Sequence, residues 1–157
     1  MIQPKFVKFE GAQVRGLGKA LNEDRISEIK TLWQDFNKFC ENKGIPHRKA
    51  YGICMKNHPG ILKGTDETFV YVAAVPEQNC QQENDGMIQC ELPAGNYAVF
   101  TFSGPIAKFP DLVMHVWEHW VPENQQMYRE GPDFELYDER FDPKTASGEV
   151  DIYIPVK

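Results

Sequence analysis

Two stretches of the chain repeat apolar residues at the spacing of an amphipathic helix. In residues 26–40 the apolar positions follow one another at steps of three or one, which places them on one face of a helix with 3.6 residues per turn. Asp24 or Ser27 can cap its start. Gly44 suits the left-handed residue that ends a helix, and Pro46 prevents continuation. The pattern predicts a helix that begins near residue 26 and stops at Gly44.

The second stretch covers residues 109–121, where the apolar residues again mostly recur three or four positions apart. Pro110 fits the first turn of a helix, because its missing N–H has no partner there in any case. Pro122 cannot continue the backbone hydrogen bonding, so the helix should end at this residue.

The remaining chain consists of short segments rich in aromatic and β-branched residues, separated by Gly, Pro, Asn and Asp. They predict eight strands, at Lys5–Phe9, Gln13–Leu21, Lys49–Met55, Thr68–Val75, Gly86–Leu92, Tyr97–Ser103, Phe134–Asp138 and Glu149–Val156. Two strands, a helix and two strands therefore follow one another, and the same order then recurs. Short connections favour antiparallel pairing, which indicates an α+β layer fold.

The two halves resemble each other at a few positions. Tyr51 stands eight residues before Pro59, and Glu135 stands eight residues before Pro143. With 157 residues the chain has the length of one domain, which we expect to comprise two pseudo-repeats at about 1–78 and 85–157. Such repeats would pack about a pseudo-twofold axis with a groove between them, and Tyr51 and Glu135 would face each other across it.

Glu135 is the most informative charged residue. Strand side chains alternate, so Phe134 and Leu136 should lie under the helices while Glu135 and Tyr137 face either solvent or the groove. A carboxylate beside aromatic rings in a groove attracts lipophilic cations through its charge and the ring quadrupoles. An exposed strand face fits the same pattern, so the groove stays a hypothesis at this point.

Tyrosines supply the rings for such a site. Tyr51, Tyr71, Tyr137 and Tyr153 all fall in predicted strands, and tyrosine suits a groove wall because its ring packs while its hydroxyl group finds a partner. Ordinary core packing explains any one of them equally well. The binding hypothesis therefore depends on several of them gathering around Glu135.

His115, Glu118 and His119 form the H-x-x-E-H signature of certain zinc proteases. The two histidines would lie on one helical face, but that face is turned away from the apolar stripe, the helix is short, and no third ligand stands out. We therefore expect a solvated helix flank and no metal. Phosphate-binding loops and serine-nucleophile signatures are also missing from the sequence, and no cofactor is expected.

The net charge of −6 is unevenly distributed. Up to Lys63 there are 12 basic and 6 acidic residues, whereas from Gly64 onward there are 5 and 17. The acidic half disfavours nucleic acid and favours a cationic partner. The N-terminus has no apolar segment typical of a leader, and the longest apolar run, residues 69–75, is too short to cross a membrane. These features predict a cytoplasmic protein that contacts no membrane, with four cysteines kept as free thiols.

Several motifs resemble the GyrI-like small-molecule-binding domain, which is also the effector-binding domain of AraC-type and MerR-type multidrug-sensing regulators. They are Gly131-Pro132-x-Phe134-Glu135-x-Tyr137, the turn Asp142-Pro143, the ending 151–157, the segment 92–105, and Tyr51-Gly52-Ile53 with His58-Pro59. The resemblance spans essentially the whole chain. It implies two strand-helix-strand-strand units that form one curved antiparallel sheet, with two helices packed on it and a ligand groove between the halves.

The resemblance also implies residue roles. A glutamate at the position of Glu135 pairs with a positively charged drug, with tyrosines around it, and Phe109 and Trp117 are further candidates from the second helix. We expect a stand-alone module for amphipathic, cationic aromatic molecules. Two alternatives remain open: a hydrolase of electrophilic small molecules, with Glu135 as general base and Tyr137 orienting water, and an interaction module that binds a regulator or gyrase. A homodimer is also compatible with the resemblance.

Overall fold

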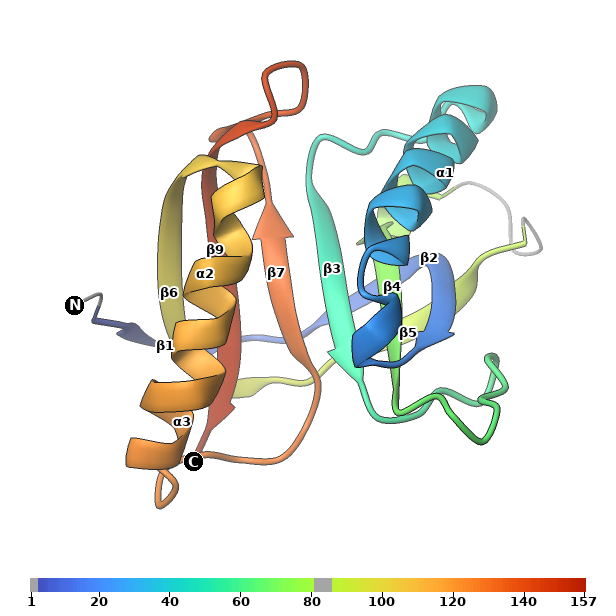
Figure 1. Cartoon of the computed structure of the whole chain (residues 1–157). Helices are drawn as coiled ribbons and strands as arrows, with labels where there is room; N and C mark the ends of the chain where they lie inside the picture. Colours follow the sequence, from blue (N-terminus) through green and yellow to red (C-terminus); the bar gives the residue numbers. More distant parts are fainter. Residues whose placement is uncertain (1–2, 81–85) are drawn as a thin grey trace.

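The computed structural model describes residues 3–80 and 86–157 as a curled antiparallel sheet with two helical segments packed on one face (Figure 1). Nine strands form the sheet: β1 (Lys5–Phe9), β2 (Ala12–Leu21), β3 (Ala50–Met55), β4 (Phe69–Pro76), β5 (Ile88–Leu92), β6 (Gly95–Pro105), β7 (Asp133–Tyr137), β8 (Phe141–Asp142) and β9 (Ser147–Val156). Their spatial order is β1-β6-β9-β7-β3-β4-β2-β5, and β8 pairs with β9. The predicted α+β class is thus confirmed.

The centre of the sheet is the antiparallel pair of β3 and β7. On one side of this pair lie the strands of the unit β2-α1-β3-β4, and on the other side those of β6-α2-β7-β9. Each unit places its helix over its own strands, so the central pair lies between the two helices (Figure 1). That the two units are copies of one ancestral repeat stays a prediction.

The first helix, α1 (Glu28–Lys43), buries Leu32, Phe36 and Cys40 at four-residue steps, as the apolar stripe predicts. Gly44 ends it in the left-handed conformation, with φ of 68°. Ser27, one of the two predicted caps, holds the N-cap position of α1, but its side chain forms no capping hydrogen bond. A 3-10 turn over Glu23–Arg25 precedes the helix, and the N-cap of this turn is Asn22, whose side chain accepts a hydrogen bond from the N–H of Asp24.

The second helical segment differs from the single predicted helix. It consists of α2 (Phe109–His115), a π-helical turn over Val116–Trp120 and α3 (Val121–Glu123). Pro122 lies inside α3, in its first turn, and the helix ends one residue later, at Glu123, and not at Pro122 as predicted. The N–H that Pro122 lacks would point back along the helix, so the proline does not stop the chain from continuing helical for one more residue. No helix in the described part of the chain has the length and apolar character that a membrane span requires.

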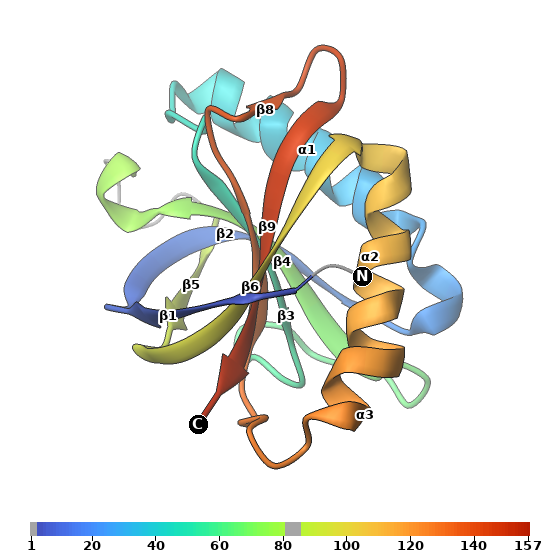
Figure 2. The same ribbon diagram turned by 90° about the vertical axis from the view of Figure 1, so that its left-hand side faces the viewer.

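The sheet is curled, as Figure 2 shows, and apolar side chains form clusters on both of its faces. The concave face gathers residues from both ends of the sheet, among them Val14, Tyr51, Tyr97 and Phe134, into one cluster. The opposite face carries two separate clusters, one under each helical segment. The gap between these two clusters lies over β3 and β7, and it positions the site described next.

Candidate functional site

A cleft opens between α1 and α2 over the central strands β3 and β7, with a volume of about 2040 Å³. Apolar side chains from both helices form its walls, and the cleft-facing residues of β3, β4 and β7 form its floor. Among the charged residues of the floor is Glu135. The sequence hypothesis of a groove between the halves therefore has a physical counterpart in the structure.

Alternation along β7 points Glu135 into this cleft. Asp133, Glu135 and Tyr137 line it, whereas Phe134 and Leu136 belong to the cluster on the concave face. The sequence correctly predicts that these two sets face opposite ways. It wrongly places the apolar pair under the helices, because the curled sheet has a second apolar side that is filled by strand residues alone.

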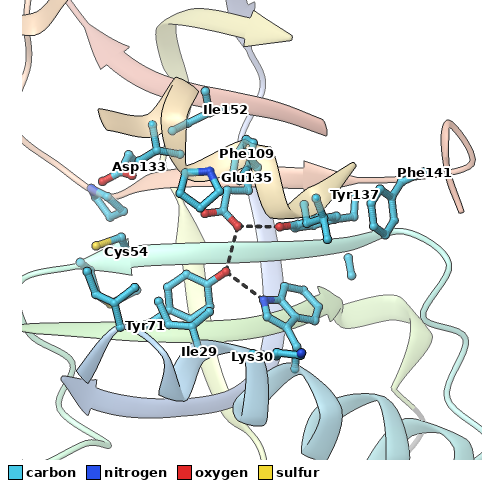
Figure 3. A pocket seen from close by; sticks show the side chains of 18 of the residues that line it. Ile29, Lys30, Cys54, Tyr71, Phe109, Asp133, Glu135, Tyr137, Phe141 and Ile152 are labelled. Carbon is cyan, nitrogen blue, oxygen red and sulfur yellow. Dashed lines mark hydrogen bonds between the residues drawn. The ribbon is translucent and has the colours of Figure 1, made fainter. Parts of the chain in front are cut away.

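A chain of hydrogen bonds fixes the carboxylate of Glu135 (Figure 3). The hydroxyl groups of Tyr71 and Tyr137 both donate to Oε1 of Glu135, at 2.9 Å and 3.0 Å. The indole Nε1 of Trp33, on α1, donates in turn to the hydroxyl oxygen of Tyr71 at 3.0 Å. Three elements that are distant in sequence thus orient one carboxylate, and Oε2 of Glu135 has no partner in the part of the chain that the structure describes.

A glycine makes room for this arrangement. Gly52 on β3 pairs directly with Glu135 on β7. A Cβ atom at position 52 would overlap the hydroxyl group of Tyr71 and would lie 2.6 Å from Oε1 of Glu135. Glycine inside a strand often marks such a close approach. Any larger residue at Gly52 would have to displace the carboxylate or the tyrosine.

Burial dominates the electrostatics of the floor. It raises the pKa of Glu135 to about 7, although the hydrogen bonds from Tyr71 and Tyr137 favour the ionised form and oppose this rise. Burial together with the nearby Glu135 charge holds the pKa values of both tyrosine hydroxyl groups well above their usual range. No ion pair involves Glu135 among residues 3–80 and 86–157.

The structure brings together five of the seven predicted site residues. Glu135, Tyr71, Tyr137, Phe109 and Trp117 all line the cleft. Phe109 is buried beneath α2, and Trp117 comes from the π-helical turn. These two residues form part of the wall opposite α1.

Tyr51 and Tyr153 lie on the other face of the sheet, in the aromatic cluster of the concave side. The ring of Tyr153 stacks on that of Phe134 with a centroid distance of 4.5 Å, and Tyr51 meets Phe134 edge-on at 5.9 Å. The expectation that Tyr51 faces Glu135 across the groove is wrong, because Gly52 is the residue opposite Glu135. A shift of one residue along a strand exchanges its two faces.

Sequence reasoning missed three residues of the site. The apolar stripe of residues 26–40 contains Trp33 and the motif Tyr51-Gly52-Ile53 contains Gly52, but neither pattern marks these residues as part of a site, and Asp133 is not among the candidates. Asp133 had a usable signal, because it stands two residues before Glu135 and must share its face. Trp33 had none, since its contact with Tyr71 joins residues 38 positions apart.

The H-x-x-E-H segment does not form part of the cleft floor. Glu118 and His119 are exposed, and the rings of His115 and His119 lie 5.2 Å apart on the outer side of the helix. No group of three or more potential metal ligands occurs among the described residues.

Comparison with known proteins places the chain in a family. The sequence model of Cass2, described as integron-associated effector binding protein, matches residues 6–156. The transcriptional regulator BrlR of Pseudomonas aeruginosa is 33% identical over 108 residues, which cover 68% of this chain and 37% of BrlR. The transcriptional regulator Rob of Salmonella typhimurium is 24% identical, over 94% of this chain and 52% of Rob. The chain therefore spans about half or less of these regulators.

Solved structures share the fold at low sequence identity. SAV2435, solved with tetraphenylphosphonium bound, superposes with a TM-score of 0.75 and 18% identity, covering 99% of this chain and 94% of SAV2435. The integron cassette protein VCH_CASS2 of Vibrio cholerae superposes with a TM-score of 0.69 and 21% identity, covering 99% and 96% of the two chains. These matches confirm the curled GyrI-like fold that the motifs predict.

Proposed function

The chain belongs to the Cass2 family of integron-associated effector binding proteins, and we propose that it binds lipophilic aromatic cations in the cleft over β3 and β7. The observation that carries the proposal is the carboxylate of Glu135, which lies among aromatic rings without a basic partner in the described chain. A cation with aromatic groups would supply the missing charge and cover the apolar walls.

Physical chemistry favours such a ligand over a neutral one. Removing a carboxylate from water costs free energy, which the raised pKa of Glu135 reflects. A bound cation recovers this cost through a charge–charge contact at low dielectric and through contacts with ring faces, each worth about 0.5–2 kcal/mol. A neutral ligand of the same shape gains only the burial of apolar surface.

Two findings on other proteins support the proposal. SAV2435 shares the fold and has been solved with tetraphenylphosphonium, which is a lipophilic aromatic cation. BrlR and Rob are transcriptional regulators, and the matched part covers 68% of this chain in BrlR and 94% of it in Rob. Signalling to a transcriptional or other protein partner is part of the proposal, as is a cytoplasmic location.

The test compares two ligands of the same shape and opposite charge. Tetraphenylphosphonium and tetraphenylborate differ in the sign of a single charge at their centre. We expect the protein to bind the phosphonium and not the borate in calorimetry at pH 8. Glu135→Gln keeps an oxygen for Tyr71 and Tyr137 but removes the charge, and it should weaken phosphonium binding by about 1–3 kcal/mol.

A matched control separates charge from local structure. Glu139 is exposed and lies just beyond β7, so Glu139→Gln removes one negative charge from the same region without touching the cleft floor. Its phosphonium affinity should equal that of the unmodified protein. If the Glu135→Gln protein binds the phosphonium with the same affinity as the unmodified protein, the proposal is overturned.

A hydrolase is the second candidate function, and one observation favours it. The pKa of Glu135, raised to about 7, falls in the range of an effective general base, and Tyr137 donates to the same carboxylate. In this case Glu135 would take a proton from water as the water attacks an electrophilic carbon. If the unmodified protein and the Glu135→Gln protein hydrolyse such electrophiles at the same rate, the hydrolase function is excluded.

A further inference from the structure

Asp133 is a second carboxylate on the cleft face of β7. It stands two residues before Glu135, so the two positions are about 6.7 Å apart along the strand. Both side chains line the cleft, and Figure 3 shows them side by side above β3. The floor of the cleft therefore carries two acidic groups at a fixed spacing.

Each carboxylate has its own aromatic surroundings. Around Glu135 these come from α1, β4 and β7, as described above. Near Asp133 the ring is that of Tyr128, which lines the cleft and meets Trp117 edge-on at a centroid distance of 5.9 Å. The charge of Asp133 lies close enough to Tyr128 to contribute to the raised pKa of that hydroxyl group, after the effect of burial. Asp133 thus also has an aromatic side chain close by.

Asp133 also lacks a partner. In residues 3–80 and 86–157 its carboxylate forms no ion pair and no hydrogen bond to another residue. Lys56, at the mouth of the cleft, is paired with Glu130 at 3.4 Å, and both of these side chains are 80% exposed. Burial, and to a smaller extent the neighbouring Glu135 charge, raise the pKa of Asp133 to about 8.

We propose that Asp133 is a second cation subsite, so that the cleft selects rigid dications whose two positive centres are separated by about two residues of a β-strand. One centre would contact Glu135 and the other Asp133, with an aromatic spacer between the cleft walls. The inference rests on the proposed function, because it takes the Glu135 subsite as given.

The test again uses two ligands of one shape. In p-xylylene-bis(trimethylammonium) a benzene ring separates two quaternary ammonium groups. In 4-tert-butylbenzyl-trimethylammonium an uncharged tert-butyl group replaces one of them. Calorimetry at pH 8.5 gives the dissociation constants of both ligands for the same protein. We expect the dication to bind about tenfold more tightly than the monocation, which is the effect of one additional charge-assisted contact.

Asp133→Asn identifies the group responsible. It should weaken binding of the dication more than binding of the monocation and so reduce the preference for the dication to within about twofold. Glu130→Gln is the matched control, because it removes a neighbouring acidic charge that is exposed and already paired with Lys56. This control should keep the preference. If Asp133→Asn lowers the affinity for the dication and for the monocation by the same factor, the inference is overturned.

A measurement on the unmodified protein gives an independent test. Asp133 must lose its proton to bind a cation, so the preference for the dication should rise between pH 6 and pH 9. The titratable and charged groups around Asp133 are Glu135 on its own strand, Cys54 and Lys56 from β3 and the segment after it, and Tyr128 and Glu130 from the segment before β7. Of these groups, Glu135 also titrates between pH 6 and pH 9. It contacts both ligands, so its titration changes both dissociation constants alike and does not change their ratio.

The outcomes distinguish the two proposals. If the protein binds the monocation and shows no preference for the dication at any pH, the second subsite is wrong and the proposed function stands. If it binds neither these ligands nor tetraphenylphosphonium, cation recognition at Glu135 is itself wrong, and the second subsite fails with it.

Discussion

Aromatic residues lie on both faces of the central strand pair, β3 and β7, but they pack differently on each face. On the concave face Tyr51, Phe134 and Tyr153 pack ring against ring and leave no room between them. On the face toward the helices, Tyr71 and Tyr137 direct their hydroxyl groups to one carboxylate and border an open cleft. Both faces are rich in aromatic residues, and the cleft lies on the face toward the helices.

The difference originates in what covers each face. The curl of the sheet brings both of its ends over the concave side, so strand residues alone close that core (Figure 2). On the other side α1 and α2 each cover their own strands and leave β3 and β7 between them (Figure 1). Gly52 has no side chain, so it leaves space for the side chains of Glu135 and Tyr71 where they meet on the floor of the cleft. An aromatic residue thus becomes part of a binding site through the gap above it.

Truncation of the closed face should produce the largest effect on stability. Phe134 is 1% exposed and contacts the rings of Phe9, Tyr51, Tyr97 and Tyr153. Phe134→Ala should lower the free energy of unfolding by about 3–5 kcal/mol, measured by denaturant titration. Phosphonium binding by the fraction that stays folded should change little, since this ring does not line the cleft. A loss of affinity without a loss of stability would contradict the separation of the two faces.

Filling the open face should affect binding more than stability. Gly52→Ala inserts a methyl group where Tyr71 and Glu135 meet, so the two side chains must move apart. We expect a loss of about 1–3 kcal/mol in the free energy of unfolding from overpacking, and a loss of phosphonium affinity at least as large as that of Glu135→Gln. Calorimetry and denaturant titration of one sample give both values.

Gly86→Ala serves as a control for the glycine substitution, because a Cβ atom there meets no atom of the described residues within 4 Å and Gly86 does not line the cleft. Its positive φ of 90° makes the change destabilising for reasons of backbone conformation alone. Phosphonium affinity should stay unchanged in Gly86→Ala. If Gly52→Ala also keeps its affinity, the close approach at Gly52 does not shape the binding site.

The sequence predicts the elements of this fold well, because each depends on local patterns. The α1 stripe, its end at Gly44 and the alternation along β7 follow from side-chain spacing and backbone preferences, and the structure confirms them. The π-helical turn over Val116–Trp120 has no such pattern, since its apolar residues also fit an ordinary helix. The short strand β8 is two residues long and forms only through its pairing with β9.

The site is less predictable because it depends on contacts between distant segments. Glu135 and Tyr137 share a face by local alternation, so their joint position follows from sequence. Their partner across the sheet depends on strand register, and a displacement of one residue decides between Gly52 and Tyr51. The concave core also has no local signature, which is why Tyr153 fits the predicted site and yet packs elsewhere.

The smallest expected effect links the open face to pH. The pKa of Glu135 is about 7 in the folded protein and near 4.5 in the unfolded chain, so the folded state holds more protons between these values. Stability must therefore fall as pH rises through this window. The side chain at position 135 in Glu135→Gln cannot ionise. The difference in free energy of unfolding, Glu135→Gln minus unmodified protein, should therefore be about 1–2 kcal/mol larger at pH 8 than at pH 5. The acids with lowered pKa values, Glu28, Glu67 and Asp138, complete their titration below this range.

Denaturant titrations at both pH values measure the change, and Glu139→Gln should show none. A saturating concentration of tetraphenylphosphonium should reverse the trend in the unmodified protein, because the cation binds the ionised carboxylate and is displaced by its proton. A stability difference between Glu135→Gln and the unmodified protein that does not vary with pH would mean that this carboxylate is solvated in the folded state. The contrast between the two faces would then no longer include a buried charge.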